Sequence, residues 1–462
     1  MKILIRQGEI ITATDRYVAD IYVEDGKVCA IGKDLKKAYS ADRTLDAGGL
    51  LVLPGGIDAH THMDMPFMGT RSSDDFETGT AAALVGGTTS IIDFAIQTQG
   101  HTMLDAFNQW MERAQGQAVG DFAFHMAVTD FNDKTLLEVE QLMTKGITSF
   151  KTFTAYKGAL MLDDRMLFGL MNEVKKRGGI VTVHAENGDL IDTLVQQALA
   201  QGHTSPRHHY LTRPALAEAE AGSRVMDLAY QSDCPLYIVH TTCDEALERI
   251  KRNYLRHQRI YVETCTQYLL LDDSLYEQEG FEGAKWVMSP PLRKKKDQEA
   301  LWKDLAAGHV HTVATDHCPF NFNGQKDAGK SAFTKIPNGA PGIQHRLELL
   351  YTHGVLQNRI SLNRFVEIMS TAPAKIFGLF PRKGTIAVGS DADIVLFDPK
   401  AEGVISAKTH KHRVDYSAYE GWKTKGKVAT VLKAGRVTYE NNNLDAQKGQ
   451  GQYLARKPFQ HL

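Results

Sequence analysis

Two histidines, His60 and His62, lie two residues apart just after an apolar run at residues 50–53. Side chains alternate along an extended strand, so both imidazoles are expected to point to the same side. Imidazole is the commonest metal-binding side chain, and two such rings from one strand end supply half of a metal site. Because a lone His-x-His pair often arises by chance, the interpretation needs further ligands from other segments.

Polar side chains also follow other apolar runs. The runs at 147–150, 180–183, 236–239 and 311–314 lead, in this order, to Lys151, His184, His240 and the Thr315-Asp316-His317 stretch. Histidines and a carboxylate without thiolates favour Zn²⁺, Mn²⁺, Co²⁺ or Fe²⁺ with open positions for water. The Lys151 ammonium has no lone pair, so residue chemistry alone makes it a salt-bridging or substrate-binding lysine.

The segments that carry these residues alternate between short apolar runs and helical stretches across residues 54–375. Counting the His60 strand, about eight β units are present, and helices are predicted at 135–145, 165–177 and 215–231. This pattern predicts an α/β fold with a (β/α)₈ TIM-like barrel, whose active site forms at the carboxyl ends of the strands. A doubly wound open sheet is the alternative, but no Gly-x-Gly-x-x-Gly follows the first strand.

Both ends of the chain have a different, β-rich character. Residues 1–53 and 376–440 contain short alternating strands, which predicts one small β-sandwich domain built from both termini. Two separate β caps are the alternative. Residues 441–462 are polar and rich in Gln and Gly, and are expected to form a C-terminal tail, either as an arm or as a frayed end.

Composition excludes several functional classes. The chain has 462 residues, 43% of them hydrophobic and 23% charged, as in ordinary globular proteins. A net charge of −2 without a long basic run argues against nucleic acid as a partner, and no apolar run is long enough to span a membrane. Five scattered cysteines without a Cys-x-x-Cys motif predict a reducing, cytoplasmic location.

Four motifs together resemble the amidohydrolase superfamily. They are His60-Thr61-His62, the stretch 149–157 around Lys151, His184-Ala185-Glu186-Asn187 and Asp316-His317-Cys318-Pro319. Within the superfamily the sequence is most similar to the cyclic amidases, in particular bacterial D-hydantoinases and dihydropyrimidinases. Supporting stretches lie at 65–70, 86–89, 288–293 and 337–339. The resemblance covers nearly the whole chain and implies a barrel flanked by a β-sandwich.

The resemblance also implies a role for Lys151. The matching lysine of the family reacts with CO₂ to give N6-carboxylysine, an anion whose two oxygens bridge two metal ions. By analogy His60, His62, Lys151 and Asp316 would hold one ion, and Lys151, His184 and His240 the other. Nearby dications favour the neutral amine that this reaction needs and stabilise the carbamate. The expected cofactors are two divalent ions, Zn²⁺ first, with Mn²⁺ or Co²⁺ as alternatives.

The implied reaction is hydrolysis of a cyclic amide by a water molecule that the two ions share and acidify. Asp316 would act as the general base and acid, and Tyr156 would donate a hydrogen bond to the oxyanion. The counterparts of Ser289 and Asn338 bind the imide edge of the ring. An apolar wall for the substituent at ring position 5 is expected from Met63, Met65, Phe67, Ile96 and Phe153.

Three other functions of related proteins are the alternatives to this one. A dihydroorotase binds a substrate carboxylate with an arginine just after the His-x-His, where this chain has Met63 and Asp64. An allantoinase is harder to separate, because allantoin is itself a substituted hydantoin. Non-catalytic dihydropyrimidinase-like assembly proteins lose metal ligands, whereas all six ligand positions are retained here. The family implies a homodimer or homotetramer, with a small-molecule cyclic amide as substrate.

Overall fold

The barrel is an eight-stranded parallel sheet. The computed structural model describes residues 1–254 and 259–459. Its barrel strands are hydrogen-bonded in the order β15-β14-β13-β12-β11-β10-β9-β6. A parallel bridge between Thr61 and His317 and a 2.9 Å hydrogen bond from His62 N to His317 O bring the ends of this row together. The strands are β6 (Gly56–Thr61), β9 (Thr88–Ile96), β10 (Asp121–Ala127), β11 (Ser149–Phe153), β12 (Ile180–His184), β13 (Leu236–Ile238), β14 (Ile260–Cys265) and β15 (Thr312–Ala314).

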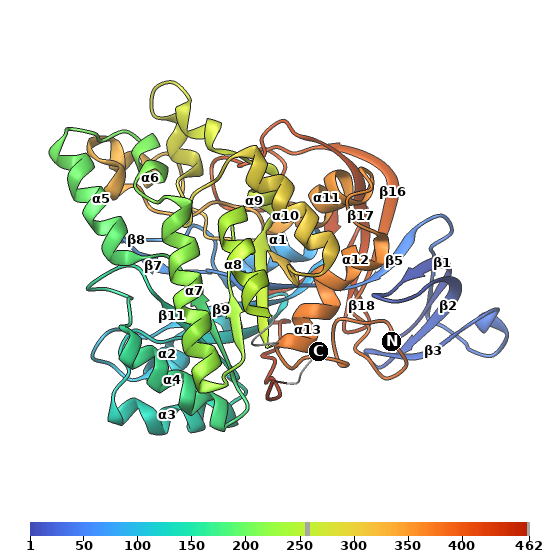
Figure 1. Ribbon diagram of the computed structural model, residues 1–462. Helices are drawn as coiled ribbons and strands as arrows, with labels where there is room; N and C mark the ends of the chain where they lie inside the picture. The colour runs from blue at the N-terminus through green and yellow to red at the C-terminus, as the bar shows by residue number, and fades with distance from the viewer. Residues whose placement is uncertain (255–258, 460–462) are drawn as a thin grey trace.

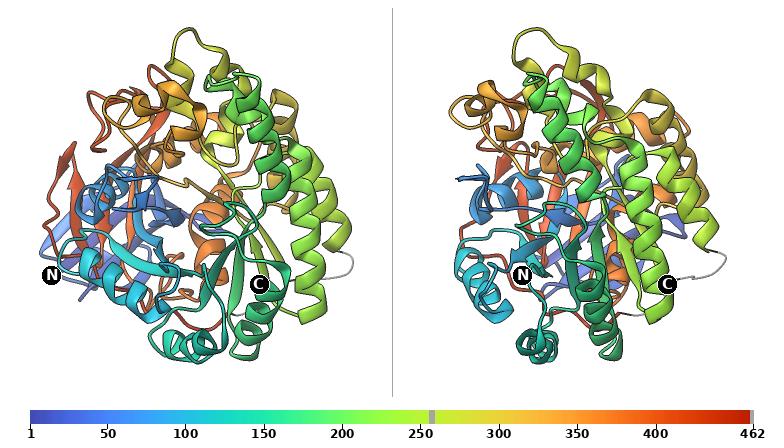
Figure 2. Two further views of the ribbon diagram at one scale, coloured as in Figure 1. Left: turned by 90° about the vertical axis from the view of Figure 1, so that its left-hand side faces the viewer. Right: turned by 60° about the vertical axis from the view of Figure 1, so that its left-hand side comes forward.

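Helices follow the strands and cover the outside of the barrel (Figures 1 and 2). This arrangement buries both faces of the parallel strands, which is why they read as continuous apolar runs in the sequence. The prediction of a (β/α)₈ barrel is confirmed. The helices are α1 (Phe76–Val85), α2 (Met103–Ala114), α3 (Asp133–Thr144), α4 (Asp164–Lys176), α5 (Gly188–Ala200), α6 (Arg207–Leu211), α7 (Ala215–Ser232), α8 (Asp244–Tyr254), α9 (Thr266–Leu270), α10 (Lys295–Ala307), α11 (Arg346–Leu350), α12 (Leu362–Val366) and α13 (Ala372–Ile376).

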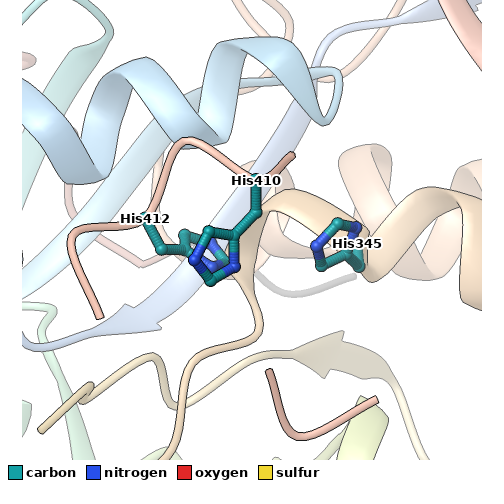
Figure 3. A group of neighbouring side chains, drawn as sticks. All are labelled: His345, His410 and His412. Atoms are coloured by element: carbon teal, nitrogen blue, oxygen red, sulfur yellow. The ribbon is translucent and has the colours of Figure 1, made fainter. Parts of the chain in front are cut away.

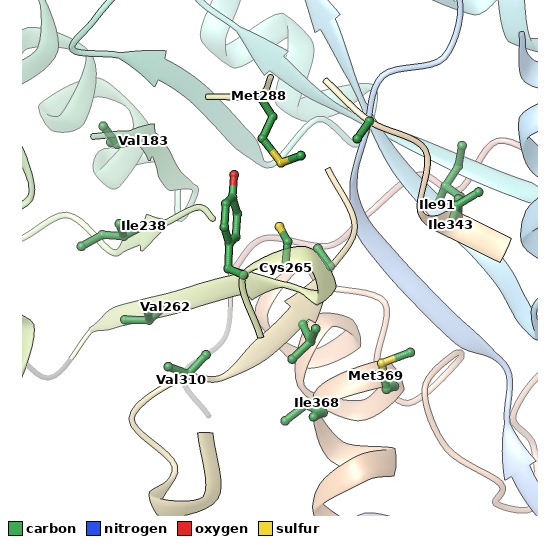
Figure 4. Close-up of a cluster of buried hydrophobic side chains, with 14 of the residues drawn as sticks. Ile91, Val183, Ile238, Val262, Cys265, Met288, Val310, Ile343, Ile368 and Met369 are labelled. Carbon is green, nitrogen blue, oxygen red and sulfur yellow. The ribbon is translucent and has the colours of Figure 1, made fainter. Parts of the chain in front are cut away.

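The main core lies between the strands and these helices. Figure 4 shows part of it, with Val183, Ile238 and Val262 from neighbouring strands and Ile368 and Met369 from the segment before α13. A separate cluster joins barrel residues such as Ala59, Ile92 and Tyr237 to Phe377 and Leu454. The two clusters fix the strands on both faces and so hold the strand ends in place.

The strands of both termini form one further sheet, seen at the right of Figure 1 with N-terminal strands in blue and C-terminal strands in orange to red. The β5 strand pairs in parallel with β1 and antiparallel with β16, so it joins the two ends of the chain. The prediction of a β domain from both termini is therefore confirmed. The strands are β1 (Lys2–Ile11), β2 (Arg16–Glu24), β3 (Lys27–Gly32), β4 (Arg43–Asp46), β5 (Leu51–Pro54), β16 (Ile394–Val404), β17 (Lys423–Lys433), β18 (Arg436–Glu440) and β19 (Asn443–Leu444).

The C-terminal segment is an arm that packs on the barrel. After β19 the chain reaches β10, where Phe122 N donates to Gln452 O at 3.0 Å and Leu454 N donates to Phe122 O at 2.7 Å. The Leu454 side chain is fully buried. Residues 460–462 of the expected tail lie outside the described residues. Among the residues that are described, no helix combines the length and apolar character needed to cross a bilayer.

Candidate active site

Six potential ligands meet at the carboxyl ends of the barrel strands. His60, Lys151 and His184 belong to β6, β11 and β12, while His62, His240 and Asp316 come shortly after β6, β13 and β15. Asp316 Oδ1 lies 3.2 Å from His60 Nε2 and 3.1 Å from His62 Nε2. His184 Nδ1 lies 2.9 Å from His240 Nε2. All six residues line one cleft.

Three residues of this cleft have left-handed backbone conformations. The φ angles are 38° at His240, 50° at Asp316 and 65° at Tyr156. Residues other than glycine rarely adopt positive φ, and such strain persists only where the surrounding structure enforces it. Here the turn that follows each strand aims the side chain into the cleft.

Lys151 is a buried lysine in the middle of this ligand set. Burial lowers its pKa to about 8, because the ammonium loses its hydration. Its Nζ lies 5.0 Å from the ring centroid of Phe94 and 5.1 Å from that of Phe153. Within the described chain no carboxylate forms an ion pair with Nζ, so the neutral amine is accessible near physiological pH. A neutral amine is the form that can react with CO₂.

A buried carboxylate that the sequence analysis missed orients two of the histidines. Glu263 Oε1 lies 2.7 Å from His60 Nδ1 and accepts a 3.0 Å hydrogen bond from His240 N. The proton on His60 Nδ1 therefore faces Glu263, and the lone pair of Nε2 faces Asp316. Carboxylates orient metal-binding histidines in this way. The available signal was a glutamate at the end of an otherwise apolar run, 260–263.

A second carboxylate, Glu186, orients His184 in the same manner. Its Oε2 lies 2.8 Å from His184 Nε2 and accepts a 2.9 Å hydrogen bond from Arg213 Nη1. Burial alone would raise the pKa of Glu186, but Arg213 and His184 outweigh it and lower the pKa to about 2. The lone pair of His184 Nδ1 then faces His240. The sequence analysis quoted Glu186 only as part of the His184 motif.

These groups fit divalent cations. His60, His62 and Asp316 each offer one ligand atom within 4.8 Å of the others. Burial lowers the pKa values of His60 and His240 well below the usual value, so their rings are neutral and hold lone pairs. The His184 and His240 nitrogens share one proton, and a cation between the two rings would replace that proton.

The expected substrate-binding residues lie beside this ligand set. Tyr156, Ser289 and Asn338 line the cleft, and Asn338 Nδ2 donates to Ser289 Oγ at 3.1 Å. Burial raises the pKa of Tyr156, so its phenol stays protonated. The apolar part of the wall comes from Met65, Phe67, Ile96, Phe153 and Leu160. Of these, Leu160 was not anticipated from the sequence.

Met63 departs from the expectation that it belongs to the substrate wall. Its side chain is fully buried and packs against Gly79 of α1, while its amide donates to Asp93 Oδ2 at 2.8 Å. Side chains of neighbouring residues on an extended segment point in opposite directions. Because His62 faces the cleft, Met63 faces the outer core, and it is not among the residues that line the cleft.

Comparison with known proteins places this geometry in a family. A model of the amidohydrolase family matches residues 51–438. A D-hydantoinase of Streptomyces coelicolor is 47% identical over 99% of both chains, and a dihydropyrimidinase of Rattus norvegicus is 43% identical over 99% of this chain and 89% of its own. The crystal structure of a dihydropyrimidinase from Brevibacillus agri, 49% identical, covers 100% of both chains with a TM-score of 0.99. The chain therefore belongs to the amidohydrolase family, within the group of cyclic amidases that contains the D-hydantoinases and dihydropyrimidinases.

Proposed function

We propose that this chain hydrolyses the ring amide bond of hydantoins and 5,6-dihydropyrimidines to give N-carbamoyl amino acids. The observation that carries the proposal is the shared cleft, in which the six potential ligands meet Tyr156, Ser289 and Asn338. A nucleophile formed among the ligands would lie next to donors that can hold a cyclic imide. The names of the relatives support the same reaction class.

Two divalent ions complete the proposed site, with Zn²⁺ expected first and Mn²⁺ or Co²⁺ as alternatives. His60, His62 and Asp316 would hold one ion, His184 and His240 the other, and carboxylated Lys151 would contact both. When bound, such ions lower the pKa of a shared water molecule and polarise the ring carbonyl. The lowered pKa of Lys151 supports its carboxylation, because the neutral amine is the reactive form.

Asp316 moves the proton in this proposal. Burial would raise its pKa, but His60 and His62 outweigh burial and keep the pKa below the ordinary value. The group is therefore a carboxylate at neutral pH and can accept a proton from the attacking water. It then passes this proton to the leaving ring nitrogen. General acid–base catalysis of this kind contributes roughly 10²–10⁴-fold to the rate.

Tyr156 stabilises the oxyanion that develops on the attacked carbonyl. Its raised pKa keeps the phenol protonated, and the phenol lies close to the side chains of Ser289 and Asn338. A donor that is already in place costs no reorganisation when the charge forms. Ser289 and Asn338 hold the imide edge of the ring, and this fixes which carbonyl faces the nucleophile.

The cleft favours neutral rings with apolar substituents. Among the described residues that line it, Lys151 is the only lysine or arginine. Asp64, two residues after His62, pairs with Arg71 at 2.9 Å and with Arg113 at 3.6 Å outside the cleft. Among the described residues that line this cleft there is thus no arginine to bind a substrate carboxylate, and this argues against dihydroorotase activity. Phe67 and Phe153 would contact the substituent at ring position 5.

The remaining proposals concern assembly and location. We propose a homotetramer or homodimer in the cytoplasm. Four of the five cysteines are buried and Cys29 is exposed. Scattered cysteines of this kind are expected of a protein in a reducing compartment. Oligomeric state is measured by light scattering on the purified protein.

A substrate panel tests the proposed reaction. Initial rates are measured on dihydrouracil, hydantoin, both enantiomers of 5-phenylhydantoin and allantoin, with metal content determined on the same sample. We expect hydrolysis of dihydrouracil and the hydantoins to exceed that of allantoin, with divalent metal bound. Faster hydrolysis of allantoin than of dihydrouracil would make the chain an allantoinase. Absence of both metal and hydrolysis would instead indicate an assembly protein.

A further inference from the structure

Three histidines outside the active site form a second cluster (Figure 3). His345 ends a 3₁₀ turn (Ile343–His345) that precedes α11 on the barrel. His410 and His412 lie on the long loop between β16 and β17 of the terminal sheet. One ligand atom of each ring lies within 4.8 Å of the others. The proposed reaction uses none of the three.

Hydrogen bonds fix the tautomers of two of these rings. His345 Nδ1 lies 2.6 Å from Glu348 Oε1, and His410 Nε2 lies 3.0 Å from Val414 O. Both acceptors are oxygens, so each of these nitrogens carries the proton and the other nitrogen of the ring holds a lone pair. Within the described chain, His345 Nε2 and His410 Nδ1 are buried and have no hydrogen-bond partner. Unpaired buried nitrogens of this kind are costly unless something binds them.

The third ring, His412, is 6% exposed and its Nδ1 also has no partner among the described residues. Its Nε2 accepts a long hydrogen bond, 3.3 Å, from Gln344 N. Binding of a cation at Nδ1 would move the ring proton to Nε2 and break that bond. Because the bond is long, its loss is small beside the gain from a third metal ligand.

We propose that His345, His410 and His412 form a third cation site, distinct from the catalytic pair, for an imidazole-preferring ion such as Zn²⁺. Ligands of a tetrahedral zinc ion, each about 2.1 Å from it, lie about 3.4 Å apart, so the rings need to close by about 1.4 Å at most. His345 also lines a neighbouring cleft of about 440 Å³. A water molecule would serve as the fourth ligand of the ion. The Glu348 carboxylate orients His345 as carboxylates do in zinc sites.

The position of the cluster indicates what the ion would do. Two ligands come from the loop between β16 and β17, and one comes from the barrel, so the ion would link this loop to the barrel. The same loop holds Asp74 through a 2.9 Å hydrogen bond from Arg413 N. Asp74 in turn lies 3.0 Å from His317 Nε2, next to Asp316. A bound ion would thus stiffen the support of the residue that follows the proposed base.

Zinc stoichiometry tests the site directly. Holoenzyme is dialysed against micromolar Zn²⁺, and zinc per chain is measured by plasma mass spectrometry for the wild type, His410→Gln and His345→Gln. We expect each variant to bind one zinc ion fewer per chain than the wild type. His353→Gln is the matched control, because this half-buried histidine lies outside the cluster and should leave the count unchanged. Equal zinc counts in the wild type and both variants would overturn the proposal.

Thermal stability provides a second readout that does not depend on the reaction. Added Zn²⁺ should raise the Tm of the wild type and of His353→Gln, and should raise the Tm of His410→Gln by clearly less. The far-UV circular dichroism spectrum of His410→Gln without added zinc should equal that of the wild type, which shows that the variant is folded. An equal rise of Tm in the wild type and His410→Gln would also overturn the proposal, whatever the outcome of the substrate panel.

Discussion

Asp316 Oδ1 lies between the two rings of the His-x-His pair, 3.2 Å from His60 Nε2 and 3.1 Å from His62 Nε2. The Nε2 atoms of both histidines can therefore bind a cation together with this carboxylate. Asp316 lies just after β15, and the two histidines lie at the end of β6 and just beyond it. These are the two ends of the sheet, which meet where the barrel closes. Closure of the barrel therefore brings together the three residues that the proposed reaction needs at this position.

Glu263 should control metal affinity through His60. In Glu263→Gln the ring of His60 loses its carboxyl partner, and metal affinity should fall about 10–100-fold, as for other residues that orient metal ligands. Turnover at saturating metal should recover substantially. Metal titration followed by mass spectrometry and activity separates the two effects. Glu77→Gln, a half-buried glutamate in the first turn of α1, is the control. Unchanged metal affinity in Glu263→Gln would refute this role.

Carboxylation of Lys151 should depend on pH in the metal-free enzyme. With the pKa lowered to about 8, the neutral amine increases about fifteen-fold between pH 6.5 and pH 8. At constant dissolved CO₂, recovery of activity on metal addition should therefore be several-fold faster at pH 8. Removal of CO₂ should slow recovery at both pH values. A rate of recovery that does not depend on CO₂ would contradict carboxylation of Lys151.

Phe67 should set the preference for large ring substituents. Truncation in Phe67→Ala removes apolar contact worth roughly 1–3 kcal/mol, so the kcat/KM ratio of 5-phenylhydantoin to 5-methylhydantoin should fall about fivefold or more. Met63→Leu is the matched control, because Met63 lies in the outer core and should leave that ratio unchanged. The assignment fails if Phe67→Ala keeps the wild-type ratio.

A buried cluster of lysine and aspartate side chains joins the barrel to the terminal sheet. This cluster should make the stability of the protein depend on pH. Lys383 Nζ donates to Asp121 and to Asp393, each at 2.6 Å, and Lys433 Nζ donates to Asp121 at 2.7 Å. Burial alone would raise the pKa of Asp121, but the two lysines outweigh burial and lower it. A lowered carboxyl pKa stabilises the fold above the unfolded pKa, near 4, and this contribution is lost as pH falls through the folded pKa.

Replacement of Lys383 therefore has a pH-dependent cost. Lys383→Met should lower stability at pH 7 by roughly 3–5 kcal/mol, because it leaves buried carboxylates without their partner. The difference in Tm from the wild type should narrow as pH falls below about 4, because the unfolded chain then takes up protons and the stabilisation from Asp121 is lost as pH approaches its lowered folded pKa. Thermal unfolding from pH 7 to pH 3 measures this. A constant difference across that range would contradict the account.

Much of the barrel could be predicted from the sequence, because strands buried on both faces leave apolar runs that are easy to find. The candidate metal ligands could be proposed for a related reason, since each of them lies at or just after the end of such a run. Glu263 was missed because a glutamate after an apolar run indicates a buried carboxylate within a strand, but not which side chain it faces. The side on which Met63 lies could not be predicted, because it depends on whether side chains keep alternating beyond the end of β6. His345 and His410 are distant in sequence, so only the folded chain brings them together.

The most direct test of the central claim is the turnover of dihydrouracil by Asp316→Asn, with metal content measured on the same sample. The amide keeps the shape of the side chain and an oxygen that can face a cation, but it cannot accept the proton. We expect the rate to fall by about 10²–10⁴-fold while most of the metal stays bound. Hydrolysis near the wild-type rate would contradict the role of Asp316 and the mechanism built on it.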